Sequence, residues 1–291
     1  MKTEEIKYIK NKDIDTILWD KCISRAQNGD VFGYSWYLDA VCLEWDALVI
    51  GDYKAVFPMP IKKVAGIKGM NHPLFFNKSN LYISKDIDSD FSSNFLKNLS
   101  LKFFNFNSEN QTLANQGYKY SKKFAYRLDL ISSYSSIKKS YSNFIKEQLK
   151  ITKQNKIFYN TGILPNGLVL LATVTDKLSK KAQNKLRVLS SFSLRKNIGE
   201  TYGAFNEKNR LIAAALFIRS HYKINIIVAY QSSEAKKKRA LYGLIDYYIK
   251  THSEKAVTLD FFGLNSMSVD FYKGIGAKEY PYYNIRKRFL F

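Results

Sequence analysis

A strand–turn–strand pattern occurs twice in this chain, about 150 residues apart. The first copy is the apolar stretch 47–60, interrupted by a polar turn at 51–54. The second is the stretch 202–217, interrupted by a polar turn at 206–210. Two apolar stretches of strand length joined by a short polar turn are typical of an antiparallel strand pair. Because the pattern recurs so far along the chain, the sequence predicts one structural unit that is used twice.

The length of the chain fits this interpretation. At 291 residues, the chain is long for a single core and suits two domains. With 46% hydrophobic and 15% aromatic residues it has enough apolar side chains for sizeable cores, which argues against a disordered protein. The residue pattern resets between 118 and 131. We therefore predict an N-terminal domain at 1–125 and a C-terminal domain at 126–291.

The chain is strongly basic. It has 46 Lys and Arg against 25 Asp and Glu, a formal net charge of +21. Such a surface carries a positive field that attracts phosphates, nucleic acid or anionic head groups. The alternative is a compositional bias of the genome, since Lys, Asn, Ile, Phe and Tyr are all frequent. Charge alone leaves both interpretations open.

The sequence predicts neither a metal site nor a disulfide framework. The two cysteines, Cys22 and Cys42, are isolated, and the three histidines (His72, His221 and His252) are scattered without ligand spacing. The N-terminus is charged and lacks the apolar stretch of a signal peptide. No apolar run approaches the roughly 20 residues of a membrane span. We therefore expect a cytoplasmic protein in a reducing compartment.

Periodicity predicts alternating helices and strands in both halves. Helices are expected at 89–98, 135–156, 176–197, 234–251 and 266–275. Strands are expected at 103–106, 124–130, 168–173, 200–206, 211–219, 223–230, 257–261 and 282–286. Helices between strands, with an antiparallel stretch in the middle, predict a mixed α/β sheet in each half.

Several local stretches resemble a known superfamily. In the first half they are 32–39, 45–49 and 55–60; in the second half they are 126–130, 259–263 and 271–277. These stretches, and the order of elements in the second half, resemble the FemAB-like branch of the GNAT acyltransferases, which places two such folds in tandem. The resemblance implies a degenerate GNAT-like domain at 1–125 and a GNAT-like acyltransferase domain at 126–291.

The resemblance also implies a reaction. GNAT-type enzymes move an acyl group from a thioester such as acetyl-CoA to an amine, here a small-molecule or cell-envelope amine. An alternative donor is aminoacyl-tRNA, although the coiled-coil arm that tRNA-dependent members often carry is not visible in this sequence. A third alternative is a binding protein that has kept the scaffold and lost the chemistry.

The resemblance places a donor-binding site at the strand-to-helix junction 231–239. The predicted cofactor-binding residues are Gln231, Ser232, Ser233, Lys236, Lys237, Lys238 and Arg239. A helix N-terminus attracts anions, and four consecutive cations add to that attraction. The glycine that the family uses is replaced by Ala235. The alternative is a solvated helix face that binds no donor.

Three residues are predicted as catalytic. Asp260 and Asn265 follow the next strand, where Phe262 and Leu264 replace the acid and the serine of the family pattern. Both polar residues also suit plain capping roles. Tyr272 matches an aromatic residue near the leaving thiol in many GNAT domains, where it would donate a proton. The alternative for Tyr272 is an ordinary core aromatic residue.

Three further residues are predicted to bind substrate. Lys273 matches a family lysine that meets phosphates, although a helix C-terminus favours any cation. Trp36 would stack on a sugar or base, or pack in the core of the first domain. His72, in a loop before Pro73, would lie on the acceptor side.

A lysine stripe completes the candidate residues. Lys146, Lys150 and Lys153 fall on one face of the predicted helix 135–156. They would line an anion-binding groove, or simply form a solvated helix face.

Overall fold

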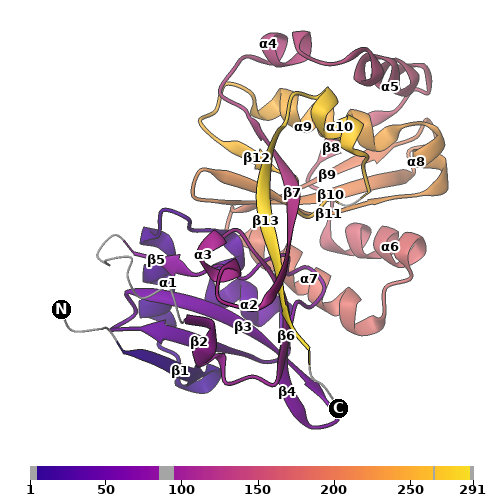
Figure 1. The fold of residues 1–291 in the computed structure, drawn as a ribbon. Helices are drawn as coiled ribbons and strands as arrows, with labels where there is room; N and C mark the ends of the chain where they lie inside the picture. Colours follow the sequence, from indigo (N-terminus) through magenta and orange to yellow (C-terminus); the bar gives the residue numbers. More distant parts are fainter. Residues whose placement is uncertain (1–4, 85–94, 265, 289–291) are drawn as a thin grey trace. The chain divides into compact units, whose positions relative to one another are not determined.

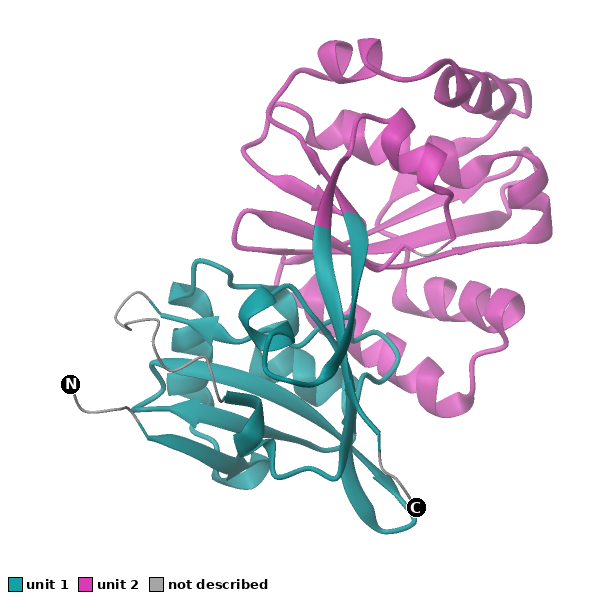
Figure 2. Cartoon of the chain, in the orientation of Figure 1, with its two compact units in different colours: residues 1–125, 281–291 teal, residues 126–280 magenta. Residues whose placement is uncertain are grey.

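A computed structural model describes residues 5–84, 95–264 and 266–288 of the chain. These residues form two compact units (Figure 2): residues 1–125 with 281–291 make unit 1, and residues 126–280 make unit 2. The chain leaves unit 1 along strand β7 (Lys119–Asp129) and returns to it along strand β13 (Lys278–Lys287). The predicted mixed α/β class is confirmed in both units.

Unit 1 is built on a mixed sheet (Figure 1). Its strand order is β1-β2-β3-β4-β6-β13, with only β4 and β6 pairing in parallel among the described strand pairs of the unit. The further strands are β1 (Ile6–Lys10), β2 (Trp45–Ile50), β3 (Ala55–Val64), β4 (Ile67–Asn71), β5 (Tyr82–Ile83), which pairs with β3, and β6 (Phe103–Ser108). The helices are α1 (Thr16–Arg25), α2 (Ser35–Val41) and α3 (Gln111–Ala114), with 3-10 turns at Asn11–Asp13 and Val31–Gly33.

Helix α1 shows why these residues fold as they do. The carboxylate of Asp15 accepts hydrogen bonds from the backbone N–H groups of Ile17 and Leu18, and so caps the helix. The buried residues Trp19, Cys22 and Ile23 lie at helical spacing on one face. The Trp19 indole also donates to the Gly33 carbonyl at 2.7 Å, which satisfies its polar group inside the core.

Unit 2 has the strand order β7-β12-β11-β10-β9-β8, in which β11 and β12 are parallel. The further strands are β8 (Phe158–Thr161), β9 (Gly199–Phe205), β10 (Leu211–Ser220), β11 (Lys223–Gln231) and β12 (Thr258–Asp260). The helices are α4 (Tyr134–Lys139), α5 (Asn143–Gln154), α6 (Pro165–Asp176), α7 (Lys180–Arg195), α8 (Ser233–Lys237), α9 (Ala240–His252) and α10 (Val269–Gly274).

The sheets of the two units share one plan. The two copies of the sequence pattern are the antiparallel pairs β2–β3 and β9–β10. In each unit a third antiparallel strand follows (β4 or β11), and this strand then pairs in parallel with the next one, β6 or β12. The predicted reuse of one structural unit is therefore confirmed.

Three predicted elements differ in the structure. The stretch 168–173 lies in helix α6, not in a strand. Pro165 is at the start of this helix, and Leu168, Leu171 and Ala172 are buried at helical spacing on it. The helix predicted at 135–156 is two helices, α4 and α5, and the one predicted at 234–251 is also two, α8 and α9. Most of the helix predicted at 89–98 lies outside the described residues.

Helix α9 is held against the sheet of unit 2 by aromatic stacking. The ring of Tyr248 lies parallel to that of Phe217 on β10, with 3.6 Å between centroids. On the helix, Gly243 allows a close approach, because a Cβ atom there would lie 1.8 Å from the Tyr159 hydroxyl. The helix that follows the predicted donor junction is thus fixed in place. None of the described helices is long and apolar enough to cross a membrane.

Candidate active site

Strands β11 and β12 separate in unit 2. Their parallel pairing covers Lys223–Asn225 against Thr258–Asp260, and β12 ends there, whereas β11 continues to Gln231. Beyond the last paired residue, β11 carries a bulge: its partner register on β10 shifts between Leu216 and Phe217, opposite Val228 and Ile226. Ile227 is therefore an extra residue that leaves the regular ladder. The strands open next to an irregular stretch of backbone.

The predicted donor junction lies at the end of β11. The Ser232 hydroxyl accepts from the Ala235 N–H and begins α8, and Arg239 adopts a left-handed conformation (φ 57°) from which α9 starts. Ser233, Lys236, Lys237 and Arg239 are exposed. The junction residues predicted from the sequence are therefore together at the start of α9, with three of the four cations open to solvent.

The fourth cation, Lys238, is engaged by Glu234. Its Nζ lies 3.0 Å from Glu234 Oε1, and the same carboxylate accepts from Asn206 and pairs with Arg210. The hydrogen bond from Asn206 and the neighbouring cations lower the pKa of Glu234. Ala235, which stands at the expected glycine, is fully buried. Glu234, Ala235 and Lys238 of the junction therefore hold helix α8 in place.

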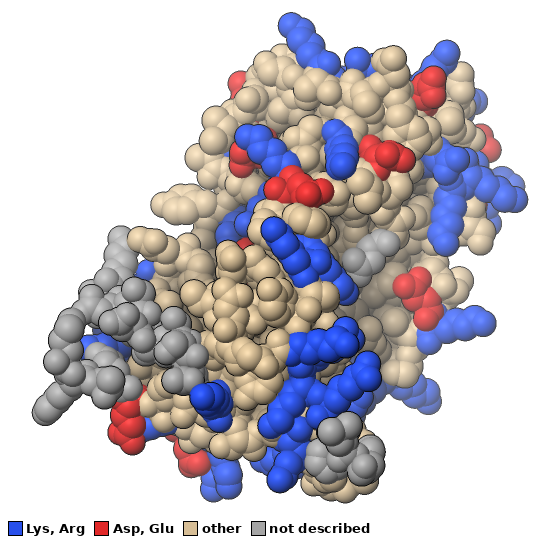
Figure 3. Space-filling view, in the orientation of Figure 1, with Lys and Arg blue, Asp and Glu red and all other residues tan. Residues whose placement is uncertain are grey.

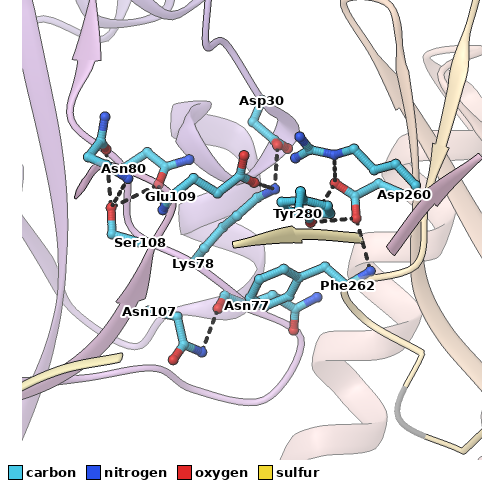
Figure 4. Close-up of polar contacts among 12 residues, drawn as sticks. Asp30, Asn77, Lys78, Asn80, Asn107, Ser108, Glu109, Asp260, Phe262 and Tyr280 are labelled. Atoms are coloured by element: carbon cyan, nitrogen blue, oxygen red, sulfur yellow. Dashed lines mark hydrogen bonds and ion pairs between the residues drawn. The ribbon is translucent and has the colours of Figure 1, made fainter. Parts of the chain in front are cut away.

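Asp260 ends β12 as a buried hydrogen-bond acceptor (Figure 4). Its carboxylate lies 3.0 Å from Arg127 Nε, and it accepts from the Tyr280 hydroxyl at 2.9 Å and from the Phe262 N–H at 3.0 Å. The Arg127 guanidinium also stacks over the Tyr280 ring at 3.6 Å. This predicted catalytic residue therefore ties β12 to β7 and β13 within unit 2.

Tyr272 is a buried residue of α10. Its hydroxyl donates to the Leu264 carbonyl, and its ring stacks on Tyr126 with 4.8 Å between centroids. Burial raises the pKa of Tyr272, so the hydroxyl keeps its proton at neutral pH. A protonated, oriented phenol fits a proton donor, and its packing equally fits the core. Asn265, the third predicted catalytic residue, lies outside the described residues.

The lysine stripe lines a groove between α5 and α9. This groove has a volume of about 460 Å³, and Lys146, Lys150 and Lys153 line it together with Lys138 and Lys250. The lining includes one carboxylate, that of Asp246, which accepts from the Tyr134 and Tyr141 hydroxyls. Burial raises the pKa of Asp246 despite these two hydrogen bonds. The groove is therefore basic along its rim.

The predicted substrate residues do not all lie in unit 2. Lys273 is exposed near the end of α10. Trp36 and His72 belong to unit 1, where the Trp36 ring packs edge-on against Tyr37 at 5.4 Å. His72 packs against the Phe76 ring and lies 3.3 Å from the Ser79 hydroxyl. Burial lowers the pKa of His72 from 6.5 to about 3.

This shift predicts acid sensitivity. The unfolded chain protonates His72 below pH 6.5, whereas the folded protein keeps it neutral until about pH 3. The stabilisation is thus complete above pH 6.5 and is lost as the pH falls from 6.5 towards 3. When the pH falls from 7 to 5, the free energy of unfolding should drop by about 1 to 2 kcal/mol more for the wild-type protein than for His72→Gln. Urea unfolding at both pH values measures this difference, with His221→Gln as the control. If the free energy of unfolding changes equally with pH in the wild-type protein and in His72→Gln, His72 is not the source of the acid sensitivity.

Unit 1 contains a buried charged cluster that we did not predict from the sequence. Lys78, which is completely buried, lies 2.9 Å from Asp30 Oδ2 and pairs with the carboxylate of Glu109 at 2.5 Å (Figure 4). The three residues come from distant stretches of the sequence. Only the fold brings them together. Among the described residues, no group of acidic residues, histidines and cysteines has the arrangement of a metal site.

Comparisons with solved structures identify the fold. No protein-family model matches the chain, and no curated protein matches it by sequence. Among solved structures, it is similar to FemX, with a TM-score of 0.58 and 12% identity over 97% of both chains. It is similar to L-PGS from Bacillus licheniformis, with a TM-score of 0.59 and 11% identity over 94% of this chain and 92% of that one.

A third similar structure is a tandem GNAT protein from the clavulanic acid biosynthesis pathway. Its TM-score is 0.54, with 10% identity over 97% of this chain and 98% of that one. At such low identity the likeness concerns the fold, and it covers nearly the whole chain in each case. The chain therefore has the FemAB-like fold of the GNAT type, with two units in tandem.

Proposed function

We propose that the chain is an N-acyltransferase that moves an acyl or aminoacyl group from an activated donor to an amine. The observation that carries this proposal is the separation of β11 and β12 beside the exposed cations of the junction 231–239. In this proposal unit 2 holds the donor, and Trp36 and His72 of unit 1 stay predictions from the sequence.

The geometry suggests a role for each part. The donor's carbonyl would lie along the open edge of β11. There, the bulge at Ile227 frees a backbone group from strand pairing, and this group would polarise the carbonyl. Its phosphates would meet Lys236, Lys237 and Arg239 at the start of α9. As the new amide bond forms and the donor's acyl bond breaks, Tyr272 would give its proton to the leaving group and the amine would lose its own to water. Asp260 would position the amine or the strand ends, and Asn265, outside the described residues, stays a prediction from the sequence.

Two donors fit this arrangement. Acetyl-CoA carries phosphates that would suit the exposed cations of the junction. Aminoacyl-tRNA is the second candidate. The five-lysine groove beside α9 favours it, because a long polyanion would span more cations than CoA. The acceptor would be a small-molecule or cell-envelope amine.

A thermal-shift measurement tests the proposal and separates the donors. A donor at a hundredfold excess over its Kd stabilises the folded state by about 2.7 kcal/mol. In a chain of this size, that should raise Tm by about 5 °C or more. Acetyl-CoA, desulfo-CoA, charged tRNA and uncharged tRNA are compared. A shift with acetyl-CoA alone supports the thioester donor, and a shift with charged tRNA alone supports the aminoacyl donor.

A pair of matched variants locates the site. Lys236→Gln/Lys237→Gln should reduce the shift, because it removes two exposed cations of the junction. Lys180→Gln/Lys181→Gln, at the start of α7, removes two exposed cations elsewhere in unit 2 and should leave the shift unchanged. Absence of any shift with every donor would overturn the proposed activity.

A further inference from the structure

One face of the unit 1 sheet is polar and open along strands β3, β4, β6 and β13. The strand register sets Lys62, Gly69 and Phe103 side by side in one row, and Asn71, Asn105 and Arg286 side by side in the next. Side chains two residues apart on a strand share a face. The alternate residues Met70, Phe104 and Ile285 point the other way and are buried in the core. The two rows thus form one surface.

This surface is hollowed into a groove of about 450 Å³. Figure 3 shows Lys and Arg side chains gathered where Figure 1 draws β4, β6 and the end of β13. Three of the cations that line the groove are Lys62, Arg286 and Arg288; the fourth, Lys287, lies opposite the buried Phe104 and donates to the Leu101 carbonyl at 3.0 Å. The described lining contains no acidic residue. The groove is therefore a concentrated positive site within unit 1.

Arg286 has an unsatisfied donor at this groove. Among the described residues, its Nε–H is buried and has no hydrogen-bond acceptor. A buried donor without an acceptor is unfavourable, and a guanidinium matches the geometry of a phosphate group. A phosphate oxygen at the groove would supply the missing acceptor.

The groove is lined by the Phe103 ring and by two amides, those of Asn71 and Asn105. A Cβ atom on Gly69 would lie 2.3 Å from the Phe103 ring, so the glycine makes room for the ring directly over the strand. Asn105 and Asn107 both accept from the Asn284 amide, at 2.8 and 3.0 Å. Amides both donate and accept, as the edges of nucleobases require.

We propose that this face of unit 1 binds an unpaired strand of RNA. Its aromatic ring, amides and arginines on an open sheet match the way in which single strands are held, with a base stacked on the ring and phosphates paired with cations. An anionic lipid surface would use the charge but would give no role to the Phe103 ring or to the Asn71 and Asn105 amides. The proposal does not depend on the proposed transfer activity, because it concerns a different face and needs no donor.

The test measures binding of a short oligouridylate to the full chain as a function of salt. Three cations on phosphates predict a slope of log K against log salt of about −2, since single strands give about −0.7 per contact. Lys62→Gln/Arg286→Gln should reduce the magnitude of that slope by about 1.4. The matched variant Lys12→Gln/Lys21→Gln removes two exposed cations of unit 1 that do not line the groove, and should leave the slope unchanged.

Phe103→Leu separates stacking from charge. It should weaken binding on the order of tenfold, because it removes a stacking platform, and it should keep the salt slope. A base-paired RNA duplex should bind more weakly than the single strand. Equal binding of duplex and single strand, or equal losses in both charge variants, would overturn the proposal. Preferential binding to phosphatidylglycerol vesicles would also overturn it. Circular dichroism and Tm confirm that each variant is folded.

Discussion

Lys78→Met should lower the free energy of unfolding by about 3 to 5 kcal/mol, the usual cost of removing one partner from a buried ion pair. Lys78 and Asp30 have no exposed side-chain surface, and the Lys78 ammonium lies 2.9 Å from Asp30 Oδ2. Methionine has a similar length but no charge, so it would leave the Asp30 carboxylate inside unit 1 without this cation. Urea unfolding, followed by tryptophan fluorescence, measures the loss.

The chain offers a matched control for this variant. Lys63 pairs with Glu44 at 2.7 Å, but its side chain is 53% exposed. Lys63→Met should therefore cost less than about 1 kcal/mol, because water screens and replaces the pair. Adding Asp30→Asn to Lys78→Met should recover part of the stability, since it removes the negative charge that the Lys78 ammonium balances. If Lys63→Met and Lys78→Met lower the free energy of unfolding equally, burial does not determine how much the Lys78 ion pair stabilises the protein.

Asp260→Asn should lower the free energy of unfolding by about 2 to 3 kcal/mol. The carboxylate accepts from Arg127, Tyr280 and the Phe262 N–H, and its side chain is fully buried. An amide keeps the shape but loses the charge and turns a donor towards at least one of these donors. The loss is largest for the bond to Arg127, because hydrogen bonds to charged groups contribute most.

Two measurements on this variant decide what Asp260 does. A positioning residue predicts that transfer activity and stability fall together, and that activity recovers at a lower temperature, where the protein is folded. A catalytic role predicts that kcat stays low even at a temperature at which the variant is folded. The control is Asp270→Asn in the first turn of α10, which is exposed and should change stability by less than about 0.5 kcal/mol.

The fold was largely predictable because its signals are local. The repeated pattern at 47–60 and 202–217 predicted both strand pairs, since two apolar stretches of strand length and the polar turn between them are visible in a single stretch of sequence. The stretch 168–173 was misassigned because a short apolar run fits a buried strand and a buried helix equally well. The break before α9 depends on the left-handed backbone conformation of Arg239, which cannot be predicted from an arginine in the sequence.

The candidate site was less predictable because its contacts are distant in sequence. The junction 231–239 is continuous and could be identified. In contrast, Asp260 meets Arg127 across 133 positions and Lys78 meets Glu109 across 31. A single sequence carries no signal for such pairs. The lysine stripe was visible as a pattern, but its partner Lys250, on another helix, was not.

The return of β13 to unit 1 has a consequence for the order of synthesis. Residues 283–287 pair with β6, and Tyr283 and Ile285 fill the core of unit 1. The ribosome makes this strand after all of unit 2. Until then the edge of β6 has no β13 to cover it, and an uncovered strand edge invites pairing with other chains. The sheet of unit 1 is therefore completed only after the whole of unit 2 has been translated.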